Sequence, residues 1–173
     1  MIESAQPLPF NDAELAIEDN SVLSKLRAQA RDKAIGLLAR REHSRFELRY
    51  KLGNLHASLD IDALLNELEQ LGLQSDRRYA GMLVRTKAQS GYGLARIRQW
   101  AKQNGVANND LMFALEELSH DWFEAALQQR QKHFGWQPPA SLQDKAKQMR
   151  YLYNRGFSQD QIHYAVDALP DGL

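Results

Sequence analysis

The chain has 173 residues, of which 43% are hydrophobic and 25% are charged, and its formal net charge is zero. This length accommodates one ordinary domain or a row of small repeated units, and it excludes a second large domain. The composition is that of a globular protein, and the 5 prolines and 10 glycines are too few for a disordered chain or one rich in strands and turns. We therefore expect an all-α protein.

Residues in arrangements that would suit a catalytic or metal-binding site are scarce. Cysteine is absent, which excludes disulfides, thiolate nucleophiles and cysteine-ligated metal sites. The five histidines include no pair at a helical metal-ligand spacing, and no acidic ligand cluster adjoins them. No nucleophile, base and orienting group can be nominated together. We therefore expect no metal, no cofactor and no enzymatic activity.

The chain has no feature typical of a targeting or membrane segment. Residues 1–20 are acidic and contain neither a basic residue nor the apolar run of a signal peptide. No apolar run approaches the roughly 18 to 20 residues that span a bilayer. We expect a soluble, cytoplasmic protein whose residues 1–24 form an acidic, partly flexible tail leading into a capping helix.

In chain order, the first predicted helix covers residues 25–42. A second helix follows it, because Ser44 with Glu47 has the spacing of a capping box, and this helix ends near Leu52. Asp60 is a candidate N-cap for a third helix. These three helices make one small unit.

The next unit begins with a helix predicted over residues 76–89. Gly91-Tyr92-Gly93 follows, and it lacks the preceding strand, the third glycine and the Lys-Ser/Thr pair of a phosphate-binding loop, so we interpret it as a turn between helices. Tyr92 is either buried between helices, which we favour, or free to contact a partner. Gly105 is typical of a left-handed helix end, and Asn108 is a candidate N-cap for the third helix.

The last unit begins with a helix predicted over residues 120–134. Gly135 to Pro139 must form a loop, because paired prolines remove amide donors and restrict the residue before them. Ser141 with Asp144 marks the start of the next helix, which stops at Gly156. Ser158 with Gln161 marks the start of the last helix, which ends at the sequence Pro170-Asp171-Gly172.

One spacing of apolar residues indicates that these units repeat. Steps of five, four and three residues join four apolar positions, and the three copies begin 47 and 51 residues apart. The last three positions of each copy share one side of a helix, so each copy marks an equivalent third helix. The copies are Leu59, Leu64, Leu68, Leu71; Val106, Leu111, Leu115, Leu118; and Phe157, Ile162, Val166, Leu169.

We therefore predict three tandem three-helix repeats over residues 25–72, 73–119 and 120–169, followed by a C-terminal tail over residues 170–173. A unit of under 50 residues buries little apolar surface alone, so such units gain stability by stacking on their neighbours. The predicted assembly is an elongated, curved array, and its handedness, right or left, stays open.

Basic residues are concentrated in the middle of the chain. Seven of them lie between Arg77 and Lys102, with no Asp or Glu. On one concave surface these residues would form a positive stripe suited to a phosphate backbone or an acidic filament groove, whereas an ordinary solvated helix face is the alternative. The candidate partner-binding residues are Arg40, Arg41, Arg45, Arg49, Lys51, Arg77, Arg78, Arg85, Lys87, Tyr92, Arg96, Arg98 and Lys102.

Several motifs carry a family resemblance. Residues 37–52 read L-L-A-R-R-E-H-S-R-F-E-L-R-Y-K-L and resemble the opening pattern of RecX proteins, L-L-A-R-R-x-H-S-x-x-E-L-x-x-K-L. Residues 76–80 and 90–99 are similar to the central RecX unit, although Ser90 replaces its usual lysine and Trp100-Ala101 replaces its Glu-Leu. Asp121-Trp122 and Arg155-Gly156-Phe157 resemble marks of the last unit. The resemblance covers residues 31–169 in order.

The resemblance implies tandem three-helix repeats that bind in the groove of the RecA–DNA filament. Such a protein inhibits strand exchange, ATP hydrolysis and coprotease activity of RecA, and thereby moderates recombination and the SOS response. We expect a monomer that contacts RecA and either single- or double-stranded DNA directly or no DNA at all. The alternatives are a sequence-independent DNA-binding protein that acts without RecA and a helical-repeat adaptor for another protein.

Overall fold

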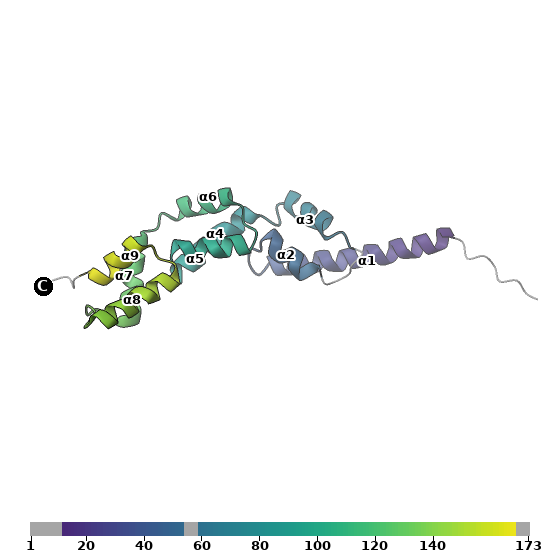
Figure 1. Ribbon diagram of the computed structural model, residues 1–173. Helices are drawn as coiled ribbons and strands as arrows, with labels where there is room; N and C mark the ends of the chain where they lie inside the picture. Colours follow the sequence, from purple (N-terminus) through teal and green to yellow (C-terminus); the bar gives the residue numbers. More distant parts are fainter. Residues whose placement is uncertain (1–11, 54–58, 169–173) are drawn as a thin grey trace, which may run out of the picture. The chain divides into compact units, whose positions relative to one another are not determined.

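The computed structural model describes residues 12–53 and 59–168 (Figure 1). These residues form nine α-helices and no strand, so the prediction of an all-α protein is confirmed. Among them no helix combines the length and the apolarity that crossing a membrane requires. The helices are α1 (Asp12–Leu38), α2 (Arg45–Leu52), α3 (Ile61–Gln70), α4 (Asp76–Gln89), α5 (Leu94–Gln103), α6 (Asn108–Leu118), α7 (Trp122–Phe134), α8 (Leu142–Arg155) and α9 (Gln159–Asp167).

The helices divide between two compact units. The first holds α1, most of α2 and α3, and the second holds α4 to α9 together with the short segment Glu42–Phe46. In the first unit, Ala30 and Ala34 of α1 pack against α2 and against the apolar side of α3. Arg27 and Arg31 of α1 also bind Glu67 of α3, at 2.8 and 3.0 Å.

The second unit has two apolar cores, one for each group of three helices. The core of α4, α5 and α6 contains Leu83, Val84 and Ile97, which are at most 5% exposed. The core of α7, α8 and α9 contains Leu152 and Phe157 among its buried side chains. This is the predicted three-helix repeat architecture, while the limits of the repeats at residues 25–72, 73–119 and 120–169 stay predictions.

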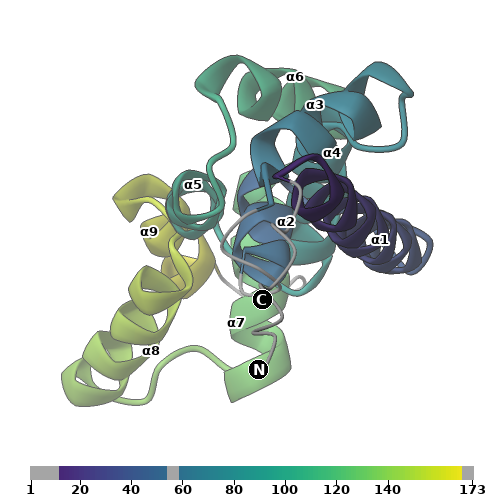
Figure 2. The same cartoon turned by 90° about the vertical axis from the view of Figure 1, so that its right-hand side faces the viewer.

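The two groups of the second unit meet through glycine backbones. The start of α5 lies beside the end of α8 (Figure 2), where the Gly93 amide donates to the Arg155 carbonyl at 2.9 Å and the Ala95 amide donates to the Gly156 carbonyl at 3.1 Å. A methyl group on Gly93 would overlap the carbonyl group of Gly156 and the amide of Phe157. Gly93 has an ordinary φ of −80°, so space alone requires glycine there, whereas Gly156 also has a φ of +91°.

Most of the predicted helix ends are confirmed. The side chains of Asp60, Ser141 and Ser158 each accept a hydrogen bond from the amide three residues further on, and Ser158 with Gln161 forms a complete capping box. Gly105 and Gly156 have the predicted left-handed conformation. The prediction for Asn108 is wrong, because α6 begins at this residue and its N-cap, Ala107, makes no side-chain hydrogen bond.

Other boundaries differ from the prediction. Helix α1 begins at Asp12 instead of residue 25, because no proline or glycine interrupts residues 12–35. The same helix ends at Leu38 and not at residue 42, since the chain turns there toward α2. Helix α7 begins at Trp122 and not at residue 120, because the Asp121 side chain accepts from two amides of its first turn.

Two positions of the apolar repeat are not seen to pack within or against a core. Leu71 is 56% exposed, because it caps α3 instead of continuing the buried side of the helix. Leu169 lies outside the described residues, as do the C-terminal tail over residues 170–173 and the first 11 residues of the predicted N-terminal tail.

A buried arginine holds the loop that follows α7. The Arg130 side chain is 1% exposed and donates to the Gln148 side chain at 2.9 Å and to the carbonyls of Trp136 and Gln137. Burial lowers the pKa of Arg130, and Asp144 partly opposes this effect. The loop of Gly135–Pro139 thus supplies two carbonyl oxygens that accept hydrogen bonds from the buried guanidinium and stabilise its charge.

The glycine contact makes a testable prediction. We expect Gly93→Ala to lower the free energy of unfolding by about 1 to 3 kcal/mol, because the methyl group must displace the backbone that pairs with α5. Gly36→Ala is the control, since nothing lies within 4 Å of a methyl group there and the residue is inside a helix. That variant should gain about 0.5 to 1 kcal/mol. Chemical denaturation measures both, and equal effects would contradict the steric contact.

The buried arginine makes a second prediction. We expect Arg130→Met to lower the free energy of unfolding by about 2 to 3 kcal/mol, because Gln148 and two carbonyls lose a charged donor. Arg130→Lys should rescue little, since an ammonium group cannot reproduce the planar fork. Lys132→Met, at an exposed position of the same helix, should change stability by less than about 0.5 kcal/mol. Thermal unfolding followed by circular dichroism would reveal a full rescue by lysine, which would refute this role.

Candidate partner-binding surface

Three of the predicted arginines line one shallow cavity of about 310 Å³ beside α4. Arg78 donates to the Glu42 carboxylate at 2.7 Å, and Arg77 lies 3.9 Å from the Glu117 carboxylate. Arg85 is exposed and forms no ion pair with another described residue. The cavity thus combines two cations that have acidic partners with one that has none.

Arg77 has a second partner. Its guanidinium lies 4.3 Å from the centroid of the Phe113 ring, on α6. Such a contact holds a cation in place without cancelling its charge. Arg77 is therefore held between the Glu117 carboxylate and the Phe113 ring.

The Trp100 ring contacts two more of the predicted basic residues. The Lys87 ammonium lies 4.5 Å from the centroid of the Trp100 ring, and the Arg96 guanidinium lies 5.2 Å from it. Arg96 also donates to the Gln99 side chain at 2.8 Å. Trp100 stands where the RecX pattern has a glutamate, so a ring face holds these cations in place of a carboxylate and leaves their charge uncancelled.

Tyr92 lies at the joint between the two groups of helices. It is partly buried, and its ring meets Trp100 edge to face at 4.7 Å. The Arg155 guanidinium lies 4.7 Å from the Tyr92 centroid and donates to the Ser90 carbonyl at 3.1 Å. This placement agrees with the burial that we favoured, and a partner contact of Tyr92 stays a prediction.

Two of the candidate basic residues on helix α5 have no acidic partner among the described residues. Arg98 and Lys102 are one turn apart and exposed, and neither forms an ion pair within residues 12–53 and 59–168. Ile97 and Ala101 point to the opposite side, into the core. Helix α5 therefore presents two fully charged groups to solvent.

The remaining predicted residues belong mostly to the first unit. Arg41 binds Glu47 at 2.9 Å, and Arg49 binds Asp62, whose hydrogen bond raises the pKa of Arg49. Arg40 and Lys51 are exposed. Arg45 belongs to the segment of the second unit, where its amide donates to the Asp76 carboxylate at 2.7 Å. A single basic surface that includes these residues stays a prediction.

Arg155 is not among the predicted binding residues, although it lies within the motif Arg155-Gly156-Phe157. Its role needs the tertiary structure, because Arg155 contacts Tyr92 across 63 positions of the sequence. Within the described part of the chain, no three His, Asp or Glu residues are grouped in a way that would hold a metal ion. The candidate residues of the second unit thus combine arginine, lysine and aromatic side chains.

Family models match both groups of helices in the second unit. Residues 75–115 match the second three-helix domain of RecX, and residues 120–166 match its third three-helix domain. The chain is also similar to solved structures, which bears on the fold alone. RecX from Lactobacillus salivarius has a TM-score of 0.68 at 24% identity over 84% of this chain and 97% of its own. Another regulatory protein RecX has a TM-score of 0.70 at 20% identity, covering 92% and 80%.

Curated relatives give higher identities. Regulatory protein RecX of Pseudomonas fluorescens Pf-5 is 42% identical over 143 residues, which are 82% of this chain and 92% of that protein. Regulatory protein RecX of Halorhodospira halophila is 37% identical over 139 residues, which are 80% and 86%. Together with the two matched domains, these identities show that the chain belongs to the RecX family of regulatory proteins.

Proposed function

We propose that this protein binds the RecA–DNA filament in the cytoplasm, as a monomer and without catalysis of its own. Binding inhibits the recombinase, ATPase and coprotease activities of RecA. Membership in the RecX family supports a regulatory role, and the resemblance described above names RecA as the partner. The observation that carries the proposal is the bare cationic face of α5, Arg98 and Lys102.

The electrostatic argument follows from the surroundings of these cations. They lie in the stretch from Arg77 to Lys102, which contains no carboxylate, and the tryptophan in that stretch holds Lys87 and Arg96 without neutralising them. A cation without a carboxylate partner need not break an ion pair before it binds a phosphate or an acidic side chain, so its own desolvation is the main cost. Many such contacts add up on a repetitive polyanion, and salt weakens them.

Charge reversal on α5 tests the proposal. We expect Arg98→Glu combined with Lys102→Glu to raise the concentration that half-inhibits the RecA ATPase on single-stranded DNA by about tenfold, because two attractive contacts become repulsive. Lys25→Glu combined with Lys132→Glu is the control, since it makes the same charge change at exposed lysines elsewhere. Circular dichroism should show unchanged helicity for both proteins. Absence of inhibition by the wild-type protein at stoichiometric concentration would refute the proposal.

Gel shifts on DNA alone separate the proposal from its alternative. We expect weak binding of the isolated protein to single- and double-stranded DNA at moderate salt, and retention of RecA in a pull-down. Tight binding to DNA without RecA would favour a sequence-independent DNA-binding protein. A pull-down that lacks RecA would favour an adaptor for another protein.

A further inference from the structure

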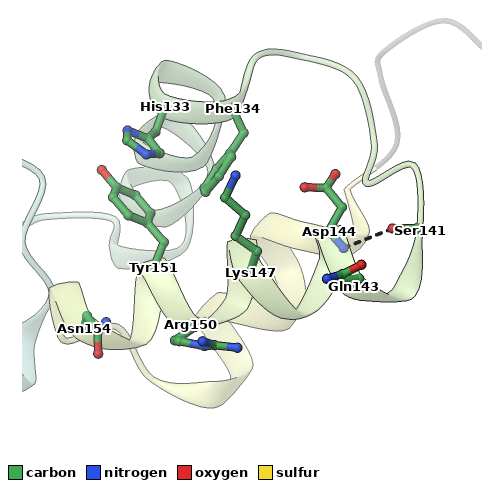
Figure 3. Close-up of a pocket in the computed structure, with 9 residues that line it drawn as sticks. All are labelled: His133, Phe134, Ser141, Gln143, Asp144, Lys147, Arg150, Tyr151 and Asn154. Atoms are coloured by element: carbon green, nitrogen blue, oxygen red, sulfur yellow. Dashed lines mark hydrogen bonds between the residues drawn. The ribbon is translucent and has the colours of Figure 1, made fainter.

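An open cavity of about 690 Å³ lies between the end of α7 and one face of α8 (Figure 3). Its volume is within the range of about 300 to 1,000 Å³ that small-molecule sites occupy. None of the partner-binding residues considered above lines it. The cavity belongs entirely to the third group of helices and needs an explanation of its own.

One face of α8 supplies hydrogen-bond donors to this cavity. Lys147, Arg150 and Asn154 recur at steps of three and four residues, which places them on the same side of the helix. All three are exposed, and none of them donates to an acceptor among the described residues. Two positive charges and an amide therefore face the cavity with their hydrogen-bonding capacity unused.

The acidic residue in the lining does not neutralise them. Asp144 lies in the first turn of α8, where its carboxylate accepts from the Ala140 amide at 3.3 Å and from the Gln148 side chain at 3.1 Å. These donors and the positive end of the helix already satisfy the carboxylate. The cavity keeps an excess of positive charge and of donors, which an anion would match.

Aromatic rings form the other wall. His133 stacks on Tyr151 with centroids 4.1 Å apart, and Phe134 meets Tyr151 edge to face at 5.3 Å. The Tyr151 hydroxyl accepts from the Gln129 side chain at 2.5 Å, which fixes the ring. The Lys147 ammonium lies 5.9 Å from the Phe134 centroid, so a cation and a ring face adjoin in Figure 3.

We infer that this cavity binds a nucleoside phosphate. The base stacks on the Phe134 ring with its edge toward His133, because these two rings are perpendicular, and the phosphate accepts hydrogen bonds from Lys147 and Arg150. A planar ring and a multiply charged oxyanion in one ligand match the two walls, because aromatic faces stack on bases while guanidinium and ammonium groups pair with phosphate. The site does not depend on RecA.

Calorimetric titration of the full chain without RecA tests this inference, with ADP as the probe and with adenosine and pyrophosphate as the two half-probes. ADP should bind at least tenfold more tightly than either half, since only ADP engages both walls. Lys147→Gln combined with Arg150→Gln should weaken ADP binding at least tenfold. Lys132→Gln, an exposed lysine on α7 outside the lining, should change it less than twofold.

Phe134→Leu separates the two walls, because it keeps an apolar side chain but removes the ring. It should weaken ADP binding severalfold and leave pyrophosphate binding unchanged. Equal affinities for ADP and pyrophosphate, or equal losses in the cavity variant and the Lys132 control, would overturn the inference. So would binding of a short single-stranded oligonucleotide without binding of ADP, which would make the cavity part of a strand-binding surface.

Discussion

The contact between the backbones of Gly93 and Gly156 determines how the second unit is built. Two interhelical amide-to-carbonyl hydrogen bonds form there, and they require a separation that no side chain on either glycine permits. Such a contact differs from ordinary helix packing, in which side chains keep the helix axes about 8 to 10 Å apart. It brings α4–α6 and α7–α9 into one compact unit, although each group has its own core.

This joint explains two of the sequence motifs together. Gly91-Tyr92-Gly93 and Arg155-Gly156-Phe157 resemble marks of different RecX units, and in the structure they face each other. Gly93 and Gly156 provide the close approach, while Arg155 covers Tyr92 and binds the Ser90 carbonyl. Tyr92 and Arg155 therefore have a structural task, whatever else contacts them.

Most of the candidate binding cations have one of three kinds of surroundings, and the difference bears on the proposed binding. Arg41, Arg49 and Arg78 face carboxylates, which must be given up before a polyanion takes their place. Lys87 and Arg96 lie on a ring that orders them and leaves their charge intact. Arg98 and Lys102 face solvent, so a polyanion can bind to α5 without first breaking an ion pair.

The sequence by itself determined the helical class, the threefold apolar spacing, the loop at Gly135–Pro139 and most helix ends, because capping, proline geometry and side-chain periodicity act within a few residues of the chain. It also placed Arg98 and Lys102 among the candidate binding residues. Only the tertiary structure decided which arginines have acidic partners, why Gly93 must be glycine, how the buried Arg130 is hydrogen-bonded, and that α7 and α8 line an open cavity with cationic and aromatic side chains. These features join residues from different helices, and a local pattern does not report which distant side chain fills the space beside it.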